Sequence, residues 1–169
     1  MVYKMAAVLL LSAAGMAGCA ETAEQEITEG VEEARAVFEQ DSPAAEELED
    51  GTELFLPDGY ELTDSADNNT ITLLNGEGVA VLEFNPNESE NSRYFYDMLA
   101  ASEDAEWLAA ETFEYAGRFG FVAVGKAGED RFEVIAGTGD AQLTGFAGKG
   151  DIEEQLTEMM KIVRSADAE

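Results

Sequence analysis

The sequence contains no histidine, one cysteine and one tryptophan. The absence of histidine excludes Ser-His-Asp and Cys-His catalysis, histidine-ligated zinc or iron, and the usual general base near neutral pH. A single cysteine excludes an internal disulfide and a CxxC redox pair. The commonest catalytic and metal-binding groups are therefore missing, and we predict no enzyme activity and no cofactor.

Basic residues are also scarce, with 9 Lys and Arg against 37 Asp and Glu and a formal net charge of −28. Nucleic acid is not an expected partner, because binding it requires Lys and Arg to neutralise phosphates. Such acidity is typical of proteins that stay hydrated in concentrated salt, as in salt-loving or marine bacteria. A diffuse cation-binding surface and recognition of a basic partner protein are the alternatives.

The sequence has no long hydrophobic run, and its most apolar stretch is a short one near the start. Lys4 precedes an apolar run from Met5 to Ala14, which only Ser12 interrupts. This run is too short to span a membrane, which takes roughly 20 residues. A basic residue, a short apolar run and a group of small residues together indicate a secretory signal peptide. We expect residues 1–18 to be removed from the mature protein.

The only cysteine lies directly behind this run. Met16-Ala17-Gly18-Cys19 resembles the lipobox of bacterial lipoproteins, although leucine is commoner at the position of Met16. The resemblance implies cleavage between Gly18 and Cys19, a diacylglyceryl group on the thiol, and a membrane anchor of acyl chains such as palmitate. Ala20, in place of an aspartate, implies the outer membrane, with the domain facing the periplasm. An ordinary signal peptide cut after Ala17 or Ala20 is the alternative.

Residues 19–50 are expected to form the lipidated N-terminus and an acidic linker. Between residues 20 and 50 there are 12 acidic residues and one basic residue, Arg35, a composition typical of solvated, extended chain. Within this stretch, a spacing of 4, 3 and 4 predicts a short helix that docks loosely on the domain or binds a partner. Its apolar residues are Ile27, Val31, Ala34 and Phe38, behind a capping box of Thr22 and Gln25.

Residues 51–165 have the pattern of one α+β domain, followed by a C-terminal tail at 166–169. Strands are expected at 54–56, 60–63, 70–74, 79–84, 107–115, 119–125, 131–136 and 142–147, with loops or turns at 57–59, 64–69, 75–78, 85–91, 127–130 and 137–140. One helix is expected from Ser92 to about Ser102. A second follows a cap of Asp151 and Glu154 and buries Ile152, Leu156, Met159, Met160 and Val163. The connections are too short for parallel crossovers, so we predict a curved antiparallel sheet with two main helices packed on one face.

The layout of this domain is similar to that of PsbP-like and DcrB-like envelope lipoproteins. The similarity is carried by Leu-Pro-Asp-Gly-Tyr at 56–60, the central hairpin and the closing amphipathic helix. A second stretch, from Arg131 to Leu156, is similar to small bacterial lipoproteins of unknown function. These resemblances imply a small envelope domain, and neither transfers a catalytic residue.

Several local patterns resemble known sites but lack required residues. The run from Gly145 to Gly150 lacks the first glycine and the final Ser or Thr of a phosphate loop, and Gly137-Thr138-Gly139 lacks the third glycine of a dinucleotide site. The alternating residues Asn85, Asn87, Ser89 and Asn91 suggest a calcium loop, but Glu90 stands at the required glycine and Tyr96 at the bidentate glutamate. Asp64, Asp67 and Asn68 could at most hold one ion weakly. We predict turns and solvated loops at all these positions, and no metal site.

The function that these features favour is that of a non-catalytic cell-envelope lipoprotein whose small acidic α+β domain binds a protein or a small ligand. Binding would use the sheet or the groove beside the helix that starts at Ser92. This hypothesis predicts an exposed apolar or aromatic patch that includes Tyr94, Tyr96 or Trp107. A carboxylate-based cation-binding module or a small carboxylate-dependent hydrolase is the alternative, and it requires acids that converge in a concave site.

The lipid anchor depends on one sulfur atom. A Cys19→Ser variant lacks the thiol that would take the diacylglyceryl group, so we expect it to incorporate no radiolabelled palmitate and to leave the membrane fraction. An Ala20→Ser control keeps the thiol and should keep the label. An unlabelled unmodified protein, or a labelled Cys19→Ser variant, would contradict the assignment.

Overall fold

The computed structural model describes residues 22–48, 53–67, 69–76, 78–102 and 105–166. The expected signal peptide, Gly18 and Cys19 lie outside the described residues, as does all of the expected tail except Ala166. Within the described ranges no helix is long and apolar enough to cross a membrane.

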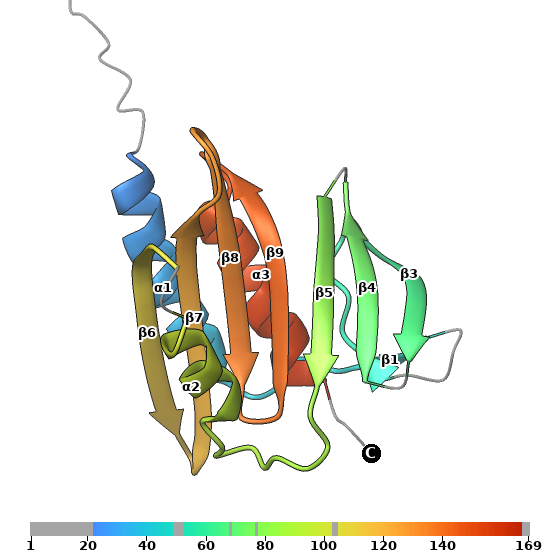
Figure 1. The fold of residues 1–169 in the computed structure, drawn as a ribbon. Coiled ribbons are helices and arrows are strands. Elements are labelled where there is room, and N and C mark those ends of the chain that lie inside the picture. The colour runs from blue at the N-terminus through green and yellow to red at the C-terminus, as the bar shows by residue number, and fades with distance from the viewer. Residues whose placement is uncertain (1–21, 49–52, 68, 77, 103–104, 167–169) are drawn as a thin grey trace, which may run out of the picture.

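A seven-stranded antiparallel sheet forms the centre of the domain (Figure 1). Its strands in chain order are β3 (Tyr60–Asp67), β4 (Thr70–Asn75), β5 (Gly78–Phe84), β6 (Trp107–Tyr115), β7 (Arg118–Lys126), β8 (Arg131–Thr138) and β9 (Ala141–Gly148). The order across the sheet is β3-β4-β5-β9-β8-β7-β6, so two meanders meet where β5 pairs with β9. The short strands β1 (Glu46–Glu47) and β2 (Glu53–Leu54) pair with each other outside this sheet.

Three helices cover the sheet unequally. The long helices α1 (Ala23–Phe38) and α3 (Ile152–Ser165) pack on one face, and the short α2 (Tyr94–Ala100) packs on the other. Alternation along β7 separates the two sides, because Val122 joins the core beneath α1 and α3 whereas Phe121 joins the cluster beneath α2. The predicted α+β fold, an antiparallel sheet with two main helices on one face, is therefore confirmed. The helix expected at Ser92–Ser102 is not one of those two, since α2 lies on the opposite face.

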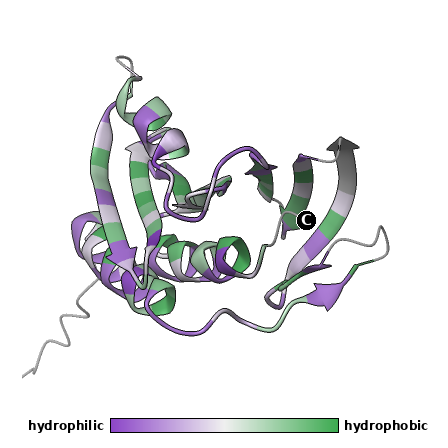
Figure 2. Cartoon of the chain, turned by 90° about the horizontal axis from the view of Figure 1, so that it is seen from below, coloured by the Kyte–Doolittle hydropathy of each residue, from purple (hydrophilic) through white to green (hydrophobic). Residues whose placement is uncertain are grey.

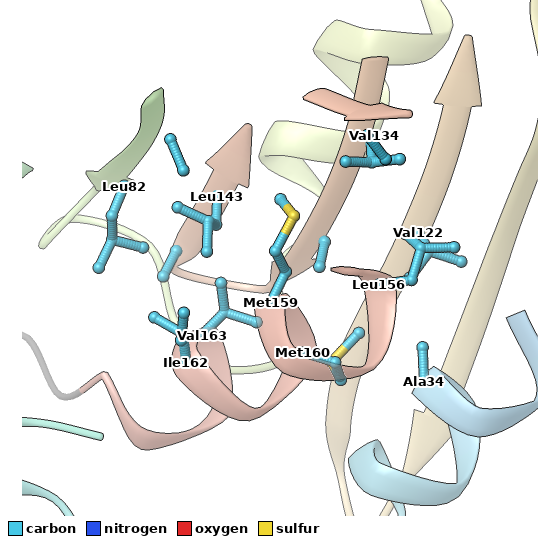
Figure 3. Packing of buried hydrophobic residues seen from close by; sticks show 14 of the residues in the cluster. Ala34, Leu82, Val122, Val134, Leu143, Leu156, Met159, Met160, Ile162 and Val163 are labelled. Atoms are coloured by element: carbon cyan, nitrogen blue, oxygen red, sulfur yellow. The ribbon is translucent and has the colours of Figure 1, made fainter. Parts of the chain in front are cut away.

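Helix α3 supplies the centre of the main core (Figure 3). The five residues predicted for its buried stripe, Ile152, Leu156, Met159, Met160 and Val163, are all at most 1% exposed. They pack against strand residues such as Leu82 and Leu143. The methionines therefore fill core space, as predicted. Asp151 is the N-cap residue, as predicted, but its side chain makes no capping hydrogen bond.

Helix α1 belongs to the same core and does not dock loosely. The predicted capping box is present, with the Gln25 amide donating to Thr22 Oγ1 and the Thr22 amide donating to Gln25 Oε1. At Gly30 the helix lies so close to α3 that an added Cβ would be 3.0 Å from Glu153 Cα. The side chain of Phe38, 1% exposed, shares one cluster with Leu54 and α3.

The expected boundary at residue 51 therefore does not separate a linker from the domain. The acidic residues of α1 lie mostly on its solvated side, and its apolar side is buried against α3. Figure 2 shows this amphipathic pattern as green and purple bands on the helices. Composition alone suggested an extended chain because it counts both sides of the helix together.

Two predicted loops are partly strand. A loop is the expectation for Asp64 to Asn69, yet β3 continues to Asp67, with two irregularities in its pairing with β4. Gly137 and Thr138, expected in a turn, belong to β8, which leaves Gly139 and Asp140 as the turn. Gly137 faces the Phe121 ring, where an added Cβ would lie 2.2 Å from Phe121 Cε1, so glycine at this position serves packing.

The packing of α1 gives a stability test. Replacing the buried ring in Phe38→Ala should lower the free energy of unfolding by about 3–5 kcal/mol, because it removes apolar contacts and leaves a cavity. Glu33 is exposed on the same helix, and Glu33→Ala should change stability by no more than about 0.5 kcal/mol. Chemical denaturation of both variants measures this difference, and equal stabilities would show that α1 is a loosely attached segment.

Candidate binding groove

The face of the sheet that carries α2 is only partly covered. Helix α2 has seven residues and packs through Leu99 on a small cluster that includes Phe119, Phe121 and Ile135. Tyr96 extends this cluster, with ring contacts to Phe119 and Phe121. Beside α2, the strands β5 and β9 continue without a helix above them in the part of the chain that the structure describes (Figure 1). A hollow remains between the helix and these strands.

This hollow, which we call the α2 groove, has a volume of about 690 Å³. Helix α2 forms one wall, and the ends of β5 and β6 contribute further apolar surface. Its main apolar lining residues are Phe84, Tyr94, Phe95, Met98, Trp107 and Ile135. The floor also carries Gln142 and Thr144 of β9 and two carboxylates, Glu83 and Glu133. The groove thus combines apolar side chains of α2, β5 and β6 with polar side chains of the strands in about equal measure.

The predicted exposed patch is present in part. Tyr94 is 41% exposed, and its neighbour Met98 is 58% exposed. Trp107 is half-buried in the groove and packs closely against Gly125, while its indole N–H lacks an acceptor among the described residues. Tyr96 does not line the groove, because its ring turns toward Phe119 and Phe121.

The sequence prediction missed Phe84, Met98 and the two carboxylates of the groove. Alternation along β5 and β8 could have assigned Glu83 and Glu133 to strand faces. Alternation could not show that Glu83 and Glu133 share one face of the sheet, because that depends on the pairing of β5 with β9, which joins residues far apart in the chain.

A second, acidic cavity of about 330 Å³ lies where β5 and β9 diverge. The two strands pair only over Val81–Phe84 and Ala141–Thr144 and then separate (Figure 1). The carboxylates that line this cavity are Asp58, Asp151, Glu154 and Glu158. Burial, and then the nearby carboxylate of Glu154, raise the pKa of Glu158. Among the residues that the structure describes, no group of three or more acids is placed to hold a metal ion.

A hydrogen-bond network of Tyr60, Asn75 and Gln155 lies beside this cavity, and Asn75 and Gln155 belong to its lining. Gln155 Nε2 donates to the Tyr60 hydroxyl over 2.7 Å, and Asn75 Nδ2 donates to Gln155 Oε1 over 2.9 Å. Burial, and then Glu158, raise the pKa of Tyr60. The network ties β3 and β4 to α3, so its polar groups serve packing between elements.

In the loops that resemble a phosphate site and a calcium site, polar groups form hydrogen bonds with other residues of the chain. The Gly150 amide of the loop that resembles a phosphate site donates to Glu26 Oε2 over 2.7 Å, so a carboxylate already occupies the anion position. In the loop that resembles a calcium site, Asn85 Oδ1 accepts from the Asn87 amide, and Ser89 Oγ donates to Asn91 Oδ1. Of the other candidates, Asp64 and Asp67 lie in β3, and Asn68 lies outside the described residues.

No protein-family model matches the chain, and no curated protein matches it in sequence. Among solved structures, the chain is similar to the solution structure of cyanobacterial PsbP (CyanoP) from Synechocystis sp. PCC 6803. The two share 13% sequence identity at a TM-score of 0.41, over 74% of this chain and 92% of that chain. No fold family and no residue role is taken from this likeness.

The raised pKa of Glu158 predicts a pH-dependent stability. The unfolded chain releases the carboxyl proton of Glu158 more readily than the folded chain, so ionisation of Glu158 destabilises the fold. The full stability is therefore present below the ordinary glutamate pKa and is lost as the pH rises above it. Glu158→Gln should therefore raise Tm at pH 7 and lose that advantage below about pH 4. Glu114→Gln, an exposed change on β6, is the control in a series of thermal melts. A pH-independent gain at Glu158 would show that ionisation of this carboxyl is not what destabilises the fold.

Proposed function

We propose that the chain is a non-catalytic cell-envelope lipoprotein whose acidic α+β domain holds another protein or a small ligand in the α2 groove. Acylated Cys19 would anchor it, in the outer membrane and facing the periplasm. The observation that carries the binding role is the exposed apolar wall of the groove, formed by Met98 and Tyr94.

The dimensions and lining of the groove support this role. Ligand sites generally have volumes of roughly 300–1,000 Å³, and the volume of the α2 groove lies within this range, with a lining that mixes apolar and polar side chains. A methionine that is more than half exposed adds a flexible, polarisable contact, which suits the recognition of another molecule. Exposed apolar patches of this kind commonly mark interaction sites.

The position of α1 is compatible with a tether at Cys19. The N-terminal end of α1 and helix α2 lie toward different ends of the sheet (Figure 1). Helix α1 begins at Ala23, only four residues after Cys19. An anchor there would hold the far end of the domain near the bilayer and leave the α2 groove open to the periplasm.

Site-specific photo-crosslinking in intact cells tests this proposal. A photoreactive side chain at Met98, inside the groove, should give one discrete adduct or one bound small molecule. The matched control is Tyr115, which is 50% exposed but does not line the groove. Identical products from both positions, or only random neighbours from Met98, would refute a binding role for the groove.

A further inference from the structure

We infer that the α2 groove takes an extended, basic segment of a partner protein, an inference that rests on the binding function proposed above. Among the described residues that line the groove, Glu83 and Glu133 alone carry a charge. Apolar side chains of α2 stand beside these two carboxylates. A groove of this composition is complementary to a peptide that alternates basic and apolar side chains.

The register of the sheet fixes where the two carboxylates lie. Glu83 on β5 is opposite Gln142 of β9, and Glu133 on β8 is opposite Phe146 of β9. The carboxylates therefore flank β9 on its two sides, about 13 Å apart along the strand and about 10 Å apart across it. The diagonal between them is roughly 16 Å, which an extended chain covers in about five residues.

Neither carboxylate is neutralised by an ion pair in the described part of the chain. The two ion pairs found there join Arg93 to Asp97 and Arg118 to Glu90. Arg131 lies two positions before Glu133 on the same face of β8, but its guanidinium stacks over Phe146, 4.2 Å from the ring centroid. That guanidinium lies over the residue directly opposite Glu133, so its charge is close to this carboxylate, but neither floor carboxylate forms an ion pair in the described part of the chain.

The charge of the whole chain favours the same occupant. A formal net charge of −28 attracts a basic segment toward the surface and repels an acidic one, which raises the association rate of the former at low salt. This field is diffuse and would act on any part of the surface. The backbone positions of Glu83 and Glu133, in contrast, are set by the register of the sheet beside the apolar side chains of α2, so the two carboxylates can select the spacing of the basic residues.

A peptide-binding experiment on the purified full-length protein in nanodiscs tests the inference. The probe is a fluorescent seven-residue peptide that alternates lysine and leucine, so that in an extended chain all its lysines project to the same side. It is compared with versions that carry glutamine or glutamate instead of lysine. We expect the lysine peptide to bind at least tenfold more tightly than the glutamine version. The double variant Glu83→Gln/Glu133→Gln should lose about tenfold in affinity for the lysine peptide.

The matched control is Glu111→Gln/Glu114→Gln, which removes the same charge from exposed positions on β6. This control should bind the lysine peptide within about twofold of the unmodified protein. Equal loss in both double variants would show attraction by net charge alone and overturn the inference. Binding of the glutamine peptide as tight as that of the lysine peptide would also overturn the inference. Full competition by spermidine would overturn it too, because it would indicate a site for small cations. If these outcomes occur while Met98 still crosslinks one discrete molecule, the proposed function stands and only the basic occupant is refuted.

Discussion

The burial of α1 and α3 together on one face of the sheet is the constraint on which the rest of the structure depends. These helices bring a continuous apolar layer against the strands, from Ile27 and Phe38 of α1 to Ile152 and Val163 of α3. Among the described residues, the short helix α2 alone lies on the opposite face, and it covers only the part above β7 and β8. The open remainder of that face becomes the α2 groove.

The distribution of charge follows from the same arrangement. The chain carries thirty-seven acidic residues, and those exposed to water repel one another less because dissolved salt screens their charges. The described part of the chain has two ion pairs, both on exposed side chains, and such pairs contribute little stability. Buried Glu26 is an exception, since it accepts a hydrogen bond from the Gly150 amide and joins α1 to the loop before α3. Apolar packing, and not charge pairing, holds the fold together.

Much of this fold could be predicted from local patterns, because strand alternation and turn chemistry act over a few residues. The strand at Trp107–Tyr115 and the buried stripe of α3 are examples. The apolar face of α1 could be predicted from spacing, but its full burial could not, because its partner α3 lies far along the chain. The groove depends on the pairing of Glu83 with Gln142, and such a long-range register leaves no local signal. Tyr94 and Trp107 could be named as candidates, but their partners could not.

The central claim is that the open face beside α2, and not the helical face, is where the protein meets another molecule. The most direct test is hydrogen–deuterium exchange on the purified protein and on the same protein in envelope membranes. We predict slower exchange in the membranes for residues 78–84, 94–100 and 141–146, with α3 unchanged. Slower exchange confined to α1 and α3, or no difference anywhere, would contradict the claim.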